Sequence, residues 1–325
     1  MKPPLRLFGA DLSPYSVKVR SYLRYKGLEH VWIPRAGAAQ AEFAKYAKLP
    51  LVPLLVDSEE QAMQDSTPIL ERLEAAHPEP SIVPPDPSCA FVSALLEDYA
   101  DEWLNKAMFH FRWGYEADQL WAAKRIVDMM TKDDPPPDRR PLEAAVRERM
   151  TGRLHFVGSN AVTGPFIERS FRRFADLLEA HLRLRPYLFG HRPALADFGV
   201  FGQVQQLLSD PTPGGILRAH CPHVVDYVDR MLEPALQGDW DAPDEVFATL
   251  APLLASDVTT FLVWSAANAR AGDTPYTIDL EGAPYSQEPQ KYAAKAFAAL
   301  RARFAAARTS DLDARLGAEA VAILA

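Results

Sequence analysis

The first 80 residues alternate short apolar runs with segments in which apolar positions recur every three or four residues. The runs with strand character lie at 5–8, 31–33 and 51–56, and 62–64 is short enough to be a hairpin partner of the last. The segments with helical periodicity lie at 14–26, 39–46 and 67–76, and Gly27 ends the first of them. The order βαβα followed by ββα predicts a small mixed sheet covered by helices.

A proline-rich stretch follows this α/β segment. Residues 77–87 read HPEPSIVPPDP and hold five prolines, which cannot form a helix and favour a stiff extended connector. The sequence therefore predicts a first domain over 1–79 and a domain boundary within this connector.

Beyond the connector the apolar periodicity is almost entirely helical. Two clear examples are the apolar positions 167, 171, 174, 178 and 182, and then 195, 198, 201, 204 and 208. We predict an all-helical domain over 88–250, interrupted by a charged, proline-rich loop at 132–141. Residues 251–325 combine a predicted strand at 276–282 with an amphipathic helix at 292–304, and we expect them to form a C-terminal extension packed on the helical domain.

Composition narrows the class of protein. The chain has 325 residues with 48% hydrophobic and 24% charged positions, a formal net charge of −8 and no sustained basic patch. These values are typical of a soluble globular protein and argue against nucleic acid and anionic membranes as partners. The apolar stretch at 249–269 is interrupted by Asp257, and we expect it to be a buried helix and not a membrane span.

The termini and cysteines indicate a cytoplasmic protein. The first 14 residues contain no apolar run of the kind found in signal peptides. Cys89 and Cys221 are too few for a disulfide framework and lack metal-ligand spacing, so we expect no metal and a reducing compartment.

Three separated features of the first domain suggest a binding site. Ser13 precedes Pro14 at a strand-to-helix turn, where serine is a favoured N-cap and proline a favoured first helical residue. Pro53 follows Val52 in a predicted strand, where it marks an edge, a bulge or a cis turn with free backbone groups. The Asp65-Ser66 pair precedes a helix and offers a carboxylate, a hydroxyl and backbone N–H groups to a ligand that carries both an amine and a carboxylate.

In this order the features resemble the cytosolic glutathione transferase superfamily. The run SPYSVKVR at 13–20 resembles the active-site helix of its serine-type classes, VPLL at 52–55 its cis-proline motif, and QDS at 64–66 its acidic-serine pair. The run LFGHRPALADF at 188–198 resembles its capping motif in the helical domain. The four motifs span roughly 200 residues in the family's order, which favours the fold more strongly than any reaction.

The resemblance implies a thioredoxin-like first domain, an all-helical second domain, a homodimer and glutathione as co-substrate. By this resemblance Ser13 hydrogen-bonds the glutathione sulfur, and Val52, before the cis Pro53, pairs its backbone with the cysteinyl unit. Asp65 and Ser66 hold the γ-glutamyl end.

Two departures from the family pattern limit these expectations. Pro50-Leu51 occupies the positions where the family usually has a Gly-Lys pair, so the contact to the glycyl end of glutathione is missing unless another residue such as Lys48 supplies it. Ala194 stands where the capping motif normally begins with Ser or Thr, so Asp197 retains only half of the reciprocal cap.

The segment 98–115 is rich in aromatic residues. On a helix Trp103, His110 and Trp113 share a stripe with Tyr99, which has two interpretations. In one, these residues form a substrate pocket together with Tyr15 of the first domain. In the other, the stripe belongs to the core and to a subunit interface, and this second interpretation is favoured.

The expected activity is attack of the activated glutathione thiol on a small hydrophobic electrophile, with isomerase, peroxidase and reductive variants open. A cysteine-based thiol transferase is disfavoured because position 13 is serine. A non-catalytic protein that uses the same fold for binding or regulation remains the alternative, because of Pro50-Leu51 and the long C-terminal segment.

Overall fold

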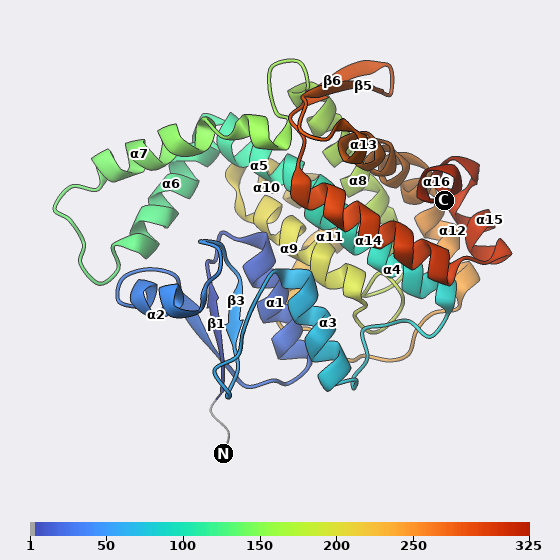
Figure 1. Ribbon diagram of the computed structural model, residues 1–325, viewed down its shortest axis with the longest axis horizontal. Coiled ribbons are helices and arrows are strands. Elements are labelled where there is room, and N and C mark those ends of the chain that lie inside the picture. Colours follow the sequence, from blue (N-terminus) through green and yellow to red (C-terminus); the bar gives the residue numbers. More distant parts are fainter. Residues whose placement is uncertain (1–3) are drawn as a thin grey trace.

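The computed structural model describes residues 4–325 and shows a small sheet domain below a larger helical body (Figure 1). The first domain is formed by β1 (Leu5–Gly9), α1 (Pro14–Tyr25), β2 (His30–Pro34), α2 (Ala39–Tyr46), β3 (Leu54–Val56), β4 (Ala62–Gln64) and α3 (Ser66–Ala76). The strand order is β2-β1-β3-β4, with β1 parallel to β2 and antiparallel to β3, and β3 antiparallel to β4. This confirms the mixed sheet predicted from the sequence.

Alternation along the central strands places apolar side chains on both faces of this sheet. Leu7 and Leu55 are buried on the face covered by α1 and α3, while the neighbouring Phe8 and Leu54 pack with Phe43 of α2 on the other face. The ladder between β3 and β4 begins at Leu54 and not at residue 51 as predicted. Proline at position 53 has no N–H to contribute to the ladder, which accounts for the shorter strand.

The connector leads directly into the helical domain at Pro87. This domain contains α4 (Pro87–Tyr99), α5 (Asn105–Gly114), α6 (Glu116–Met130), α7 (Arg140–Thr151), α8 (Gly164–Leu182), α9 (Leu195–Ser209), α10 (Pro211–His220), α11 (Pro222–Leu232), α12 (Pro243–Leu253) and α13 (Thr259–Ala271). A π-helical turn η1 (Ala100–Leu104) joins α4 to α5, η2 (Leu154–Val157) follows α7, and η3 (Leu254–Val258) joins α12 to α13.

Helix α9 is central to this domain and packs directly on α1, which fixes the helical domain against the sheet domain. Gly202 lies at this crossing, where an added Cβ would come within 2.7 Å of the Pro14 carbonyl oxygen. The glycine therefore permits the close approach of α9 to the start of α1, immediately after Ser13.

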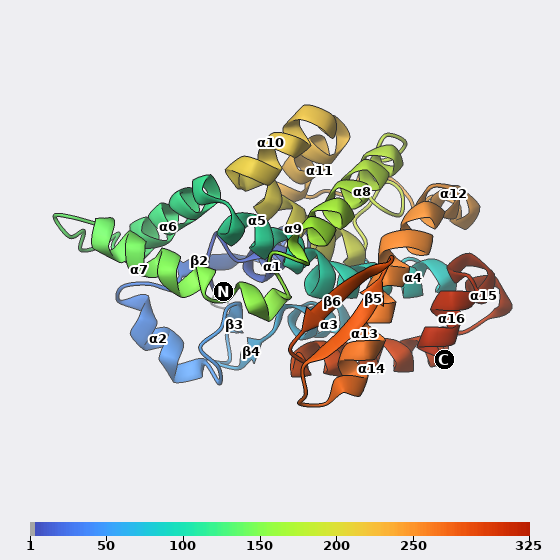
Figure 2. The same ribbon diagram turned by 90° about the horizontal axis from the view of Figure 1, so that it is seen from above.

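The C-terminal segment forms a hairpin and three helices on the side of the helical domain (Figure 2). It consists of β5 (Tyr276–Leu280), β6 (Ala283–Gln287), α14 (Lys291–Ala307), α15 (Ser310–Leu316) and α16 (Ala318–Leu324). Residue 250, where the sequence analysis ended the helical domain, lies inside α12, and the helical path continues to Ala271. The extension observed in the structure thus begins after Ala271.

The helical segment Pro243–Ala271 is long and apolar enough to span a membrane by length and composition. In its most apolar window, however, 56% is buried inside the protein, and α12 and α13 pack against α8 and α14. This packing matches the buried helix expected from the interruption at Asp257.

Candidate active site at the domain boundary

Ser13 lies at the N-terminus of α1 and is the N-cap of that helix. Its backbone is extended (φ −106°, ψ 115°), and its Oγ accepts a hydrogen bond from the Ser16 N–H at 3.3 Å. A hydroxyl has one proton to donate besides its acceptor sites, so this cap leaves the Ser13 proton available to a ligand. Ser13 is half-buried, whereas Ser16 is fully buried and does not reach a ligand from the surface.

The turn before Ser13 is held by side chains of the helical domain. Arg112 donates to the Leu12 carbonyl at 3.0 Å and forms a buried ion pair with Asp210. Gln206 donates from Nε2 to the Asp11 carbonyl at 2.8 Å. These contacts position the start of α1 relative to the second domain.

The Val52–Pro53 peptide is cis. A cis turn is one of the three alternatives that the sequence left open at this proline. Within the described residues, neither the N–H nor the C=O of Val52 has a hydrogen-bond partner. Val52 therefore presents an unpaired backbone shortly before the start of β3, the arrangement needed to pair with an extended peptide-like ligand.

Pro50 and Leu51, which depart from the family pattern, belong to an ordered loop. Gln64 binds this loop through its side-chain amide, accepting from the backbone of Lys48 and Leu49 and donating to the carbonyls of Leu49 and Leu51. Arg35 donates to the Pro50 carbonyl at 2.6 Å. Leu49 and Leu51 remain more than half exposed, so the loop presents an apolar surface where the family usually presents a lysine.

Asp65 and Ser66 lie at the N-terminus of α3. Asp65 has φ 82°, an uncommon backbone conformation for a residue other than glycine, and its side chain does not cap the helix. Ser66 is buried, with its Oγ 3.5 Å from Asp101 Oδ2. The structure thus brings Asp65 to a half-buried position beside the edge of the sheet and turns the Ser66 hydroxyl toward the helical domain.

The Asp65 carboxylate has a partner from the C-terminal extension. The Tyr292 hydroxyl, at the start of α14, donates to Asp65 Oδ2, and burial together with Asp65 raises the pKa of this tyrosine. Farther along α14, Arg303 forms an ion pair with Glu71 of α3. The extension is therefore in direct contact with the candidate site, although 227 residues separate Tyr292 from Asp65.

A group of acids surrounds a buried lysine beneath Asp65. Lys18 of α1 is fully buried and binds Glu97 and Asp101, with 2.6 Å between Lys18 Nζ and Asp101 Oδ2. Burial disfavours the charge of Lys18, but Asp101 and Glu97 raise its pKa overall. Burial raises the pKa of Asp101 to about 7, although Lys18 acts to lower it. Burial and the neighbouring Asp101 together raise the pKa of Glu102 to about 8. Asp65, which is half-buried beside this group, is the acid that a positively charged ligand group such as an amine can reach.

The aromatic stripe lies in the core, as its second interpretation predicted. Trp103 is 3% exposed and Trp113 1% exposed. The Trp103 ring packs on Phe166, Trp264 and Tyr285, and its Nε1 donates to Ser170 at 3.1 Å. Side chains this enclosed do not form the wall of an open pocket.

His110 and Tyr15 also have internal partners. The His110 ring contacts Ser159 at 2.8 Å and Glu168 at 3.3 Å, and burial lowers its pKa. The Tyr15 hydroxyl donates to the Asp101 carbonyl at 3.0 Å, and burial raises its pKa well above the ordinary value. Of the predicted pocket residues Tyr15, Trp103, His110 and Trp113, only Tyr15 lies on α1, and only Tyr15 is partly accessible.

The cap of α9 has the form expected from its sequence. Asp197 accepts from the N–H groups of Ala194 at 2.8 Å and Leu188 at 2.9 Å. Ala194 has no side-chain acceptor to return to the helix, so only half of the reciprocal cap is present.

Neither cysteine is a candidate nucleophile. Cys89 and Cys221 are both buried and unpaired, and burial raises the pKa of Cys89 to about 12 and of Cys221 to about 11. Over residues 4–325 no group of histidine, cysteine, aspartate and glutamate side chains is placed to hold a metal ion.

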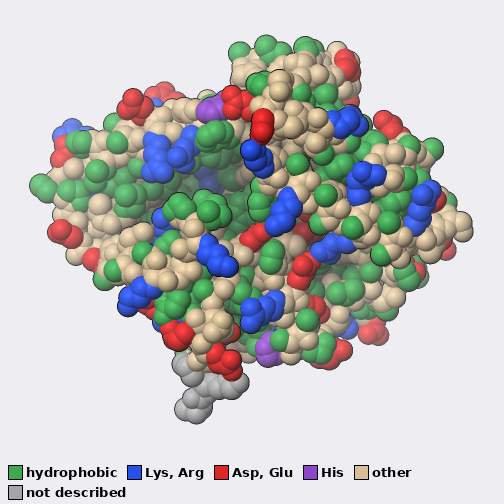
Figure 3. Space-filling model, viewed as in Figure 1, with side chains coloured by type: hydrophobic (Ala, Val, Ile, Leu, Met, Phe, Trp, Pro, Cys, Tyr) green, Lys and Arg blue, Asp and Glu red, His purple; other side chains and the backbone are tan. Residues whose placement is uncertain are grey.

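Lys18, Asp101 and Tyr292 are not predicted from the sequence as residues of this site. The buried lysine and aspartate are recognisable only once α1 lies against α4 and η1, since charged residues in amphipathic helices usually face solvent. No local pattern links Tyr292 to Asp65, because the contact depends on the path of the whole extension. In the view of Figure 3, the surface is hollowed between helices α6 and α7 and the first domain.

The fold and this site together define a two-domain protein with a thioredoxin-like sheet domain and an all-helical domain. Residues 7–81 match the N-terminal domain family of glutathione S-transferases, and residues 143–230 match their C-terminal domain family. The two matches together cover about half of the chain. The chain belongs to the glutathione transferase superfamily.

Two curated relatives are similar to parts of the chain. An isoprene-epoxide–glutathione S-transferase of Rhodococcus sp. (strain AD45) is 22% identical over 237 residues, which is 68% of this chain and 92% of that protein. A zeta class glutathione S-transferase of Euphorbia esula is 37% identical over 89 residues, 26% of this chain. The match to the Euphorbia protein spans 39% of its length.

The chain is also similar to solved structures at low identity. A glutathione S-transferase from Methylobacterium radiotolerans, in complex with glutathione sulfonate, is 20% identical with a TM-score of 0.44 and covers 74% of this chain and 99% of its own. A beta-etherase from Sphingobium sp. strain SYK-6 is 20% identical with a TM-score of 0.46 and covers 77% of this chain and 100% of its own.

Proposed function

We propose that this protein is a serine-type glutathione transferase that activates the glutathione thiol through Ser13. The observation that carries the proposal is the geometry of Ser13, whose oxygen accepts the helix-capping hydrogen bond while its proton remains free. A thiolate placed at this point accepts a hydrogen bond from the Ser13 hydroxyl and lies at the positive end of α1.

The energy required is modest. A thiol of pKa about 8.5 needs a preference of roughly 2.7 kcal/mol for its thiolate to lower that pKa by about 2 units. A hydrogen bond to a charged group contributes roughly 1.5–3 kcal/mol, and a helix N-terminus roughly 0.3–1 kcal/mol. One hydroxyl and one helix end therefore supply the activation.

The remaining glutathione contacts follow from neighbouring elements. The unpaired backbone of Val52, before the cis Pro53, pairs with the cysteinyl unit. Asp65 binds the γ-glutamyl amine through the carboxylate oxygen that Tyr292 leaves free, and the N-terminus of α3 at Ser66 binds the γ-glutamyl carboxylate.

The glycyl end of glutathione has less support. Pro50 and Leu51 offer no cation, and the exposed Lys48 beside them is the nearest substitute in the loop. We expect binding of the whole tripeptide to be weaker than a lysine at position 51 would give.

The electrophile that we propose is a small hydrophobic molecule. The loop exposes Leu49 and Leu51 beside the site, and Tyr15 contributes an aromatic edge from α1. The Rhodococcus relative is named for an epoxide, which places epoxides among the first substrates to assay.

A thermal-shift titration with glutathione tests binding. Glutathione at 100 times its dissociation constant should add roughly 2.7 kcal/mol of apparent stability. The absence of any shift at millimolar glutathione would contradict the proposal.

A non-catalytic binding protein is the second candidate, favoured by the missing cation at Pro50-Leu51. It predicts a thermal shift without turnover of any electrophile, including epoxides. Conjugation measured with the same preparation separates the two functions.

The family resemblance also implies a homodimer in the cytoplasm, and we include both in the proposal. Light scattering during size-exclusion chromatography distinguishes a monomer of 36.1 kDa from a particle of twice that mass.

A further inference from the structure

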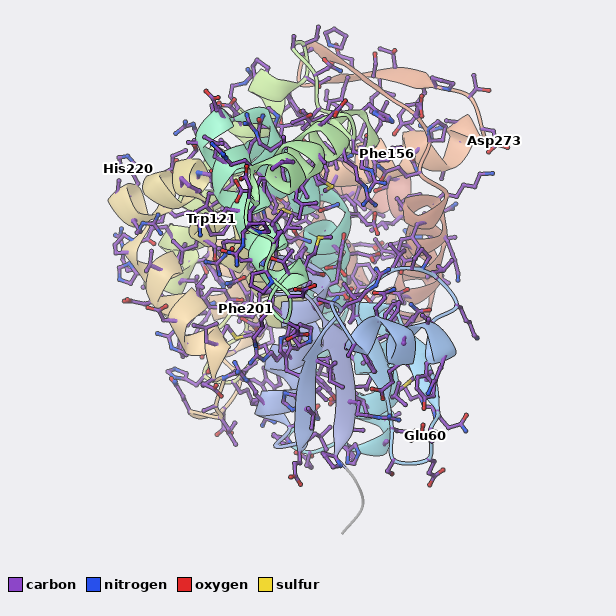
Figure 4. All side chains as sticks on the ribbon, turned by 90° about the vertical axis from the view of Figure 1, so that its left-hand side faces the viewer. Glu60, Trp121, Phe156, Phe201, His220 and Asp273 are labelled. Carbon is purple, nitrogen blue, oxygen red and sulfur yellow. The ribbon has the colours of Figure 1, made fainter. Side chains whose placement is uncertain are left out.

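A separate cavity of about 220 Å³ lies between α1 of the first domain and α6 and α9 of the helical domain. Asp11 and Leu12 form part of its lining, but none of the residues proposed to bind glutathione does. Figure 4 labels Trp121 of α6 and Phe201 of α9, which lie above the sheet domain on the side that faces the viewer. The cavity is therefore next to the turn that carries Ser13 and distinct from the site on α3 and the cis-proline loop.

One part of the cavity wall is apolar. Val17, Trp121 and Phe201 contribute to it from three different helices. An apolar cavity of about 150 Å³ is known to hold benzene in another protein, so this volume accommodates one ring with polar substituents.

Three guanidinium groups line the same cavity, from Arg20 and Arg24 of α1 and Arg125 of α6. Asp11 is the one carboxylate among the described lining residues, and its side chain is 62% exposed and 3.7 Å from Arg20. Such an excess of positive charge is notable in a chain whose formal net charge is −8.

Two of these guanidiniums have no hydrogen-bond partner among residues 4–325. Arg20 stacks on the Trp32 ring at 4.6 Å, and Arg125 stacks on the Trp121 ring at 4.8 Å. Stacking holds a guanidinium plane in place while its N–H groups remain available. Arg24 differs, since it donates to the Leu232 carbonyl at 2.6 Å and lies 3.3 Å from Glu233.

We propose that this cavity binds a small organic dianion, such as a dicarboxylate or a phosphate ester, with an apolar body of about one ring. Arg20 and Arg125 pair with its oxyanions, since a guanidinium offers two parallel N–H groups that match a carboxylate or phosphate. Trp121 and Phe201 contact its apolar body. The site is independent of the glutathione site and does not require the proposed transferase activity.

Phthalate is a suitable probe because it joins two carboxylates to one ring. Isothermal titration calorimetry of the full-length protein should show one saturable phthalate site, and saturating glutathione should leave it unchanged. Dimethyl phthalate, which has the same ring without charge, should bind at least about tenfold more weakly, because it cannot form charge-assisted hydrogen bonds. Inorganic phosphate, which lacks the ring, should also bind more weakly than phthalate.

Arg125→Gln tests the assignment of the site. Arg125 is exposed and has no ion pair among the described residues, so the substitution should leave folding intact while weakening phthalate binding about tenfold or more. Lys124→Gln is the matched control, since it removes the same charge one residue earlier, where the lysine pairs with Asp128 and does not line the cavity.

Four outcomes would overturn the proposal. The first is the absence of saturable phthalate binding, and the second is equally tight binding of dimethyl phthalate. The third is an equal loss of phthalate affinity in Arg125→Gln and Lys124→Gln, and the fourth is a loss of phthalate binding when glutathione is added. Inorganic phosphate that binds as tightly as phthalate would also contradict the organic dianion as ligand, since the apolar wall would then contribute nothing.

Discussion

Ser13 caps α1 and, in the proposed function, also donates to the glutathione sulfur, two roles that the sequence by itself leaves indistinguishable. Its oxygen caps α1 by accepting from the Ser16 N–H, and its proton remains free for a ligand. The cap and the donor use different parts of one hydroxyl, so neither role excludes the other.

Ser13→Ala should lower thiolate formation by bound glutathione without unfolding the protein. The variant loses the donor to sulfur, and it also loses the cap, which costs about 0.5–2 kcal/mol of stability. The ultraviolet absorbance of the thiolate, measured at saturating glutathione, checks the first effect. Unchanged absorbance in the alanine variant would refute the role of Ser13.

In the proposed glutathione site, Tyr292 acts through Asp65 as a positioning residue. Its hydroxyl donates to Oδ2 of the Asp65 carboxylate and leaves the other oxygen for the amine of the proposed ligand. We expect Tyr292→Phe to raise the glutathione dissociation constant by up to about tenfold, with kcat at saturating glutathione unchanged.

Arg303→Gln is the control for the Tyr292 substitution. Arg303 attaches the same helix to Glu71 of α3 and has no contact with Asp65, so its loss should change the glutathione dissociation constant less. Tighter glutathione binding by the phenylalanine variant would show instead that Tyr292 competes with the ligand.

At the scale of elements, periodicity predicted α2 at its observed bounds and α1 and α3 to within a residue. These helices have apolar positions on one face and clear end signals, such as Gly27 with φ 62° after α1. The boundary at residue 250 is a different case. The apolar stretch at 249–269 predicted a buried helix across this boundary, and in the structure α12, η3 and α13 form one helical path from Pro243 to Ala271.

Ala194→Ser should stabilise the protein by about 0.5–2 kcal/mol through the N-terminus of α9. Ala194 has the extended backbone of an N-cap (φ −99°, ψ 172°), and Asp197 already returns its half of the cap. A serine Oγ would accept from the first turn of the helix. Thermal unfolding checks this, and a melting temperature that stays the same or falls would show that the buried site has no room for the hydroxyl.

At the scale of the whole molecule, acids gathered from distant segments make stability depend on pH. Burial and the neighbouring Asp101 raise the pKa of Glu102 from 4.5 in the unfolded chain to about 8. As the pH rises, the unfolded chain therefore releases the Glu102 proton before the folded protein does. The contribution of Glu102 to the free energy of unfolding is fully present below pH 4.5 and is lost as the pH rises toward 8.

Glu102→Gln should therefore flatten the decline of melting temperature between pH 5 and pH 8, because glutamine stays neutral throughout. Glu59→Gln, at an exposed acid in the β3–β4 turn, is the control and should leave the decline as it is in the unsubstituted protein. Identical pH profiles for the two variants would show that Glu102 does not carry this effect.

The sequence by itself determined the order of elements, the domain connector and the first-domain motifs at Ser13, Val52-Pro53 and Asp65-Ser66. These features depend on local periodicity, capping and the missing N–H of proline, and each acts within a few residues of its position. The tertiary structure decided that Trp103 and Trp113 are enclosed in the core and that Lys18 is buried among acids. It also decided that Tyr292 reaches Asp65 and that Arg20 and Arg125 line one cavity. Burial and charge at such places are sums over segments far apart in the chain, and only the packing of α1 against α9 and of α14 against α4 brings those segments together.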